Sequence, residues 1–146
     1  MSEPTTGMSP KVAYRLETFI IGLGLVALLL IFQPFSITVF AIGSGLVVLA
    51  GLVNNLLPLA EPGVSLRSVF VVALVIAMIF CIVLLVSMTA AHLYGVFFLE
   101  PPNPNTMTGK AALATPPYYM QPFVWTLAII AAVLAALITY MNKTKR

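Results

Sequence analysis

The residues of this chain that could perform acid–base or cofactor chemistry are few, and His92 is the foremost. It is the sole histidine among 146 residues. An imidazole can ligate haem iron, hydrogen-bond a quinone or respond to pH. Met88 lies one turn away on the same helix face, so the two cannot bind one iron from opposite sides. We interpret His92 as a structural residue near a membrane interface, and the alternative is a haem or quinone contact shared with another subunit.

The remaining ionisable and thiol groups do not form a catalytic pattern. The chain has no aspartate, and its four glutamates fall in tails, loops or span ends: Glu3, Glu17, Glu61 and Glu100. Hydrolysis uses paired carboxylates or a nucleophile with a base, and zinc uses three or four clustered ligands. The lone Cys81 has no thiol partner and is predicted to pack as a small apolar residue. We therefore expect no enzyme activity, no catalytic residue and no metal site.

The composition places the elements around these residues in lipid. Hydrophobic residues make up 61% of the chain and charged residues 8%. Soluble domains are about 45–50% apolar and about 25% charged. The apolar segments are hydrophobic on all sides, whereas strands of a membrane β-barrel alternate apolar and polar residues. The sequence predicts an all-α integral membrane protein.

Four segments are long enough to cross a membrane, which takes about 20 helical residues. A cleaved signal peptide is disfavoured for the first, because no small-x-small site follows its apolar run. A single kinked helix over 19–53 is the alternative to a hairpin that turns at 33–36. The predicted organisation is one transmembrane domain, 1–146, with a flexible tail at 1–9, helices at 10–32, 36–57, 66–99 and 122–141, a long proline-rich loop at 100–121 and a basic tail at 142–146.

The basic residues predict the orientation. With four spans, six of them lie on one side, and only Lys110 lies on the other: Lys11, Arg15, Arg67, Lys143, Lys145 and Arg146. Cytoplasmic loops carry such an excess of Lys and Arg. We expect two helical hairpins with both termini cytoplasmic and the proline-rich loop outside. A nucleic-acid partner is not expected, because no basic patch on a polar surface is available.

Small residues mark helix faces that could pack closely. The last span carries Ala128, Ala132 and Ala136 at four-residue spacing, and the second carries Ala41 and Gly45. Such small-xxx-small faces let helices approach each other in lipid. The partner helix could belong to this chain, the favoured interpretation, or to another chain.

The asparagines that follow the second span have two interpretations. Asn54 and Asn55 could hydrogen-bond a neighbouring helix or a lipid headgroup. The favoured interpretation is that they end the span at the inner interface, because asparagine tolerates the last turn of a helix.

The proline-rich loop is the most individual segment of the chain. Prolines stiffen it, and Tyr118, Tyr119 and Trp125 lie where an aromatic belt is expected. Loops of this length are usually functional or disordered. We predict that it docks on a neighbouring subunit through these three aromatic residues, and the alternative is a flexible loop.

These features favour a non-catalytic accessory subunit of a larger integral membrane complex, such as a respiratory or photosynthetic electron-transfer assembly. The expected partners are larger membrane subunits and lipids. The chain would have no cofactor of its own and would at most contact lipid, quinone or haem at a subunit interface. The expected location is a bacterial or archaeal cytoplasmic membrane. The alternatives are a small homo-oligomeric transporter or channel for a neutral or lipidic solute, and a haem- or quinone-contacting subunit that uses His92.

Overall fold

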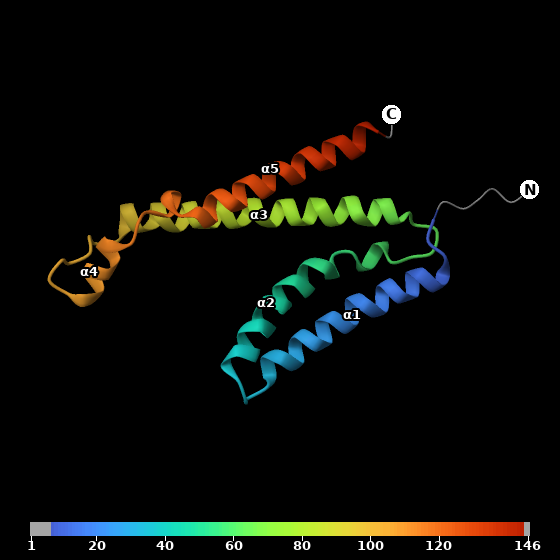
Figure 1. The fold of residues 1–146 in the computed structure, drawn as a ribbon, viewed down its shortest axis with the longest axis horizontal. Coiled ribbons are helices and arrows are strands. Elements are labelled where there is room, and N and C mark those ends of the chain that lie inside the picture. The colour runs from blue at the N-terminus through green and yellow to red at the C-terminus, as the bar shows by residue number, and fades with distance from the viewer. Residues whose placement is uncertain (1–6, 145–146) are drawn as a thin grey trace, which may run out of the picture. The chain divides into compact units, whose positions relative to one another are not determined.

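A computed structural model describes residues 7–144, and this part of the chain is helical without strands. Four helices are long and apolar enough to cross a membrane, so the predicted all-α class is confirmed at this level. The elements, in chain order (Figure 1), are α1 (Pro10–Phe32), α2 (Ile37–Asn54), the 3-10 turn η1 (Leu57–Leu59), α3 (Leu66–Phe98), α4 (Met107–Ala114), the 3-10 turn η2 (Tyr118–Met120) and α5 (Pro122–Lys143).

The second span ends three residues before its predicted limit. The side chain of Asn55 donates to the carbonyl oxygens of Gly51, at 3.0 Å, and Leu52, at 3.2 Å. These bonds occupy carbonyls of the last turn, so α2 ends at Asn54 and the separate turn η1 follows. Of the two predicted tails, only residues 7–9 and 142–144 lie within the described part of the chain.

The proline-rich segment, residues 100–121, is more ordered than its composition predicts. Prolines stand before and after a stretch without proline, and that stretch forms α4. The Thr106 hydroxyl caps α4 by accepting from the Gly109 amide at 3.0 Å. The segment predicted as a loop at 100–121 therefore contains a regular helix at 107–114, because a proline disturbs only its own turn and the residue before it.

Gln33 determines the turn between α1 and α2. Its side-chain oxygen accepts from the amides of Phe35 and Ser36 at 2.8 and 2.9 Å, and its nitrogen donates to the Ser36 carbonyl at 2.6 Å. The Ser36 hydroxyl in turn caps α2 by accepting from the Val39 amide at 3.4 Å. Polar backbone groups that would otherwise face lipid or the interface are thus satisfied locally.

The chain divides into two compact units, Met1–Ile76 and Ala77–Arg146, with the boundary inside α3. In the first unit, α1 and α2 pack side by side. The best-covered positions of α1 recur every seven residues, at Ala13, Ile20 and Ala27, and those of α2 do so at Gly43 and Ala50. A seven-residue repeat of covered positions is the packing geometry of antiparallel coiled coils.

A small hydrophobic core closes the first unit at the end where α1 begins and α2 ends. Its buried residues are Met8, Ile20, Leu56 and Val69. Met8 is held there by backbone bonds, because its amide donates to Val64 at 2.8 Å and its carbonyl accepts from Gly63 at 3.0 Å. Gly63 has a φ of +90°, which favours glycine at this turn.

The close approach of α1 and α2 at Gly43 generates a stability prediction. A Cβ at this position would lie 2.8 Å from the Leu30 Cβ, whereas one at Gly45 would meet nothing within 4 Å. We expect Gly43→Ala to lower the free energy of unfolding by about 1–3 kcal/mol through overpacking. Gly45→Ala should leave it equal or raise it by up to about 1 kcal/mol, because alanine favours helix. Unfolding in mixed detergent micelles, followed by circular dichroism, compares the two; equal stabilities would refute the assigned packing.

Candidate functional site

The proline-rich segment returns to α3 through one side-chain hydrogen bond. The Tyr118 hydroxyl, in η2, donates to the Thr89 hydroxyl oxygen on α3 at 3.1 Å. Thr89 donates its own proton to the Leu85 carbonyl at 2.8 Å. This direction of donation satisfies both hydroxyl protons, so the bond joins two elements 29 residues apart without an unpaired donor.

Three rings gather around this bond, and we call His92, Tyr118 and Tyr119 the ring cluster. The His92 ring centroid lies 4.9 Å from that of Tyr118, at a tilt of 45°, and 6.1 Å from that of Tyr119, edge-on at 85°. The two tyrosines are themselves edge-on at 5.8 Å. Such a tyrosine pair contributes about 0.5–1.5 kcal/mol beyond its area. The cluster thus fixes the position of η2 against α3.

His92 is half-buried and is held by ring contacts. Within residues 7–144 no hydrogen bond is made by its ring nitrogens, and no fully buried side-chain nitrogen or oxygen lacks a partner. The nitrogens therefore reach the surface of this chain. These ring contacts are compatible with the structural interpretation of His92, and both that interpretation and a shared haem or quinone contact stay predictions.

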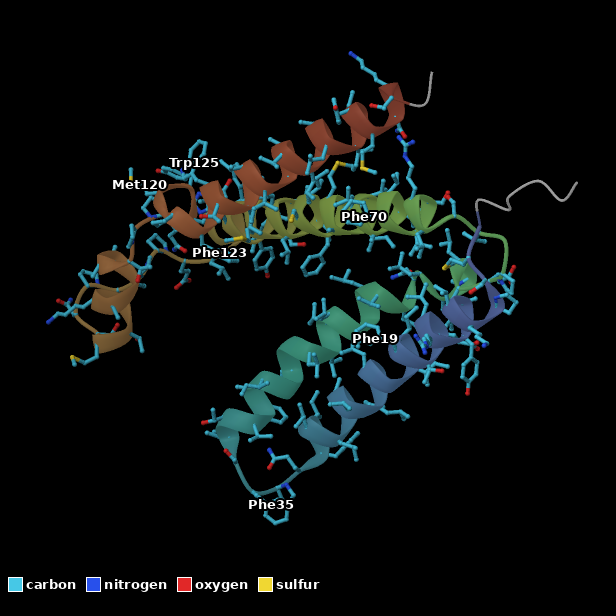
Figure 2. The ribbon with its side chains drawn as sticks, turned by 45° about the vertical axis from the view of Figure 1, so that its right-hand side comes forward. Phe19, Phe35, Phe70, Met120, Phe123 and Trp125 are labelled. Atoms are coloured by element: carbon cyan, nitrogen blue, oxygen red, sulfur yellow. The ribbon has the colours of Figure 1, made fainter. Side chains whose placement is uncertain are left out.

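Trp125 extends the cluster onto the start of α5. Its indole nitrogen donates to the Tyr119 carbonyl at 2.8 Å, which orients the ring, yet its side chain is 61% exposed. Figure 2 shows Trp125, Met120 and Phe123 together at this end of α5. All three are exposed. An oriented, exposed tryptophan with apolar neighbours suits contact with a membrane interface or another protein.

The structure therefore joins residues that the sequence placed in two separate sites. His92 was a candidate cofactor contact, and Tyr118, Tyr119 and Trp125 were candidates for docking. They form one connected group through the ring cluster and the indole bond. Thr89 is the member that sequence reasoning did not single out. The sequence feature that could have pointed to Thr89 is its position three residues before His92, on the same helix face.

The end of α3 and the start of α4 add further exposed apolar side chains. Phe97 and Phe98 are 74% and 75% exposed, and Met107 is 85% exposed. Tyr94 stacks on Phe98 with ring centroids 5.4 Å apart. The backbone of this region is ordered by its own bonds: the Asn103 carbonyl accepts from the Thr106 hydroxyl at 3.0 Å, and Gly109 packs against Asn103. The apolar groups are thus displayed on a defined scaffold.

The predicted small-residue faces are largely exposed within the described residues of their own units. Ala128 is half-buried, whereas Ala132, Ala136, Ala41 and Gly45 are exposed. Close packing uses neighbouring positions instead, Gly43 and Ala50 on α2 and Leu127 on α5. A helix has several faces rich in small residues, and the sequence alone did not select the one that is covered.

The described residues hold no group of three or more His, Cys, Asp or Glu side chains that could bind a metal ion. Cys81 is a free, buried thiol on α3. No family model, curated protein or solved structure matches the chain.

The bond between Tyr118 and Thr89 can be measured by a double-mutant cycle. We expect Tyr118→Phe and Thr89→Val to be destabilising, with a coupling of about 0.6 kcal/mol between them, typical of side-chain hydrogen bonds in membrane proteins. Unfolding in detergent supplies the free energies. Tyr119→Phe with Thr89→Val is the matched control, because no hydrogen bond joins Tyr119 to Thr89 in the described structure. Additive effects of Tyr118→Phe and Thr89→Val would contradict the assignment.

Proposed function

We propose that this protein is a non-catalytic accessory subunit that docks on a larger integral membrane complex through the end of α3 and the proline-rich segment. The observation that supports this proposal most directly is the length of α3 together with its exposed end. α3 has 33 residues, which is about 50 Å of helix, against about 30 Å of hydrocarbon. Its last turn carries Phe97 and Phe98, which are both largely exposed.

The chemistry of this end supports a protein partner. Measured from Arg67, a crossing of about 20 residues ends near Ser87, and polar Thr89, His92 and Tyr94 follow. Phe97 and Phe98 come after these polar residues, so an untilted α3 would place them beyond the hydrocarbon. Large apolar groups outside lipid favour burial against another protein.

Pre-organisation of the segment favours docking over simple mobility. The Tyr118–Thr89 bond, the ring cluster and the Trp125 indole bond hold its end, and α4 orders its middle. A surface that is already ordered loses less conformational entropy when it binds a partner.

Co-purification in mild detergent tests the proposal. The native protein should elute with a larger membrane partner in fixed stoichiometry. Replacing Phe97, Phe98 and Met107 together by alanine should reduce the bound partner by at least about tenfold, because exposed aromatic anchors often contribute 2 kcal/mol or more.

Phe35→Ala is the matched control, since Phe35 is an exposed phenylalanine in the α1–α2 turn (Figure 2) and belongs to no proposed docking surface. It should leave the partner bound. A native protein that elutes as a free monomer or homodimer would refute the proposal, as would an undiminished complex with the triple variant.

We further propose two helical hairpins with both termini on the cytoplasmic side of a bacterial or archaeal membrane. The basic residues support this orientation, because Lys110 is the lone one on the opposite side in that arrangement.

Cysteine labelling tests the orientation in a Cys81→Ser background. In bacterial spheroplasts a membrane-impermeant maleimide should label Lys110→Cys, on exposed α4, and should not label Lys11→Cys until the cells are opened. Labelling of Lys11→Cys in intact spheroplasts would reverse the assigned orientation.

A further inference from the structure

The seam between α1 and α2 opens into a groove that the docking surface does not use. It is open to the surface and has a volume of about 430 Å³, and we call it the hairpin groove. Its lining comes from both helices: Ile20, Ile21, Gly24, Leu25, Ala27, Leu28, Val47, Ala50, Gly51 and Asn54. A Cβ at Gly24 or Gly51 would meet nothing within 4 Å, so these glycines leave space free. The volume falls in the range of small-molecule sites, about 300–1,000 Å³.

The shape of the groove favours a flexible chain over a partner helix. Its α1 wall runs from Ile20 to Leu28, which is about 12 Å at the helical rise. A helix with its side chains is about 10–12 Å across and would follow the hairpin through the full bilayer. Beyond the groove, α1 and α2 close together where Gly43 meets Leu30. A single acyl chain matches this short, open, apolar groove.

The polar groups at one end of the groove suit a lipid headgroup. Asn54 is the only lining residue with a polar side chain, and its amide has no hydrogen-bond partner within residues 7–144. The amide of its neighbour Asn55 is instead engaged with its own helix. Asn54 is the last residue of α2 and lies at the same end of the hairpin as the start of α1. An amide at this level can donate to a phosphate or ester oxygen.

Glu17 adds a carboxylate that suits a lipid headgroup with a primary ammonium. It precedes Ile20 and Ile21 by three and four residues, which places it on the groove face of α1, and it is exposed. It is also the last charged residue before the long apolar run of α1. A carboxylate accepts hydrogen bonds from a primary ammonium but not from a quaternary one, which has no N–H donor.

We infer that the hairpin groove binds one acyl chain of an ethanolamine-headed phospholipid, with the ammonium at Glu17 and the phosphate or ester oxygens at Asn54. This inference is independent of the proposed docking function, because it rests on α1 and α2 alone. It predicts a preference for an ethanolamine headgroup over a choline headgroup with the same acyl chains.

Native mass spectrometry of the full chain in detergent tests the inference with these two lipids. The native protein should bind phosphatidylethanolamine at least about tenfold more tightly than phosphatidylcholine. Gly24→Leu should fill the groove and lower binding of phosphatidylethanolamine by about tenfold. Gly22→Leu is the matched control on the same helix, because Gly22 also has open space but does not line the groove.

Glu17→Gln supplies a second test that does not alter packing. It should abolish the headgroup preference while binding of phosphatidylcholine persists. Circular dichroism verifies that each variant is helical. Equal binding of both lipids by the native protein, or full binding by Gly24→Leu, would overturn the inference. Stable capture of another protein's helix in place of lipid would overturn it as well.

Discussion

Helices in lipid gain little by exchanging apolar lipid contacts for apolar protein contacts, so their association depends on close approach and on a few polar bonds. In the first unit the close approach occurs where Gly43 meets Leu30, and covered residues recur every seven positions along α1 and α2. A conventional core forms where this hairpin leaves its apolar stretch, around Met8, Ile20, Leu56 and Val69. The backbone bonds to Met8 hold residues 63 and 64 of the following loop beside this core.

In the second unit, polar contacts join η2 to α3. Tyr118 and Thr89 form a bond in which both hydroxyl protons are used, and His92 packs against the two tyrosine rings, which also contact each other. Hydrogen bonds near a membrane interface compete with water, so the rings add area and shape to a modest bond. The result is an ordered end of the proline-rich segment that presents Trp125, Met120 and Phe123 outward (Figure 2). The proposed docking function uses this ordered segment together with the exposed end of α3.

The two proposals assign different kinds of ligand to surfaces of different chemistry. The exposed end of α3 displays large aromatic side chains, which are typical anchors of protein interfaces. The hairpin groove is apolar, and Asn54, at one end, is its only lining residue with a polar side chain. That distribution matches an amphiphile whose tail lies in lipid and whose head lies at the interface. A chain with so few charged residues can still discriminate between headgroups, because Glu17 and Asn54 are close to the end of the apolar wall.

The sequence by itself determined the helical class and the four apolar spans, because segments without polar residues must satisfy their backbone bonds internally in lipid. It also identified His92, Tyr118, Tyr119 and Trp125, but as two separate sites. Only the tertiary structure joined them and added Thr89, because a bond across 29 residues leaves no periodic signal. The tertiary structure likewise showed that α1 and α2 approach closely at Gly43 and not at Gly45, and it revealed the hairpin groove. Small residues permit contact on several faces of a helix, and only the relative rotation of the two helices decides which face is covered.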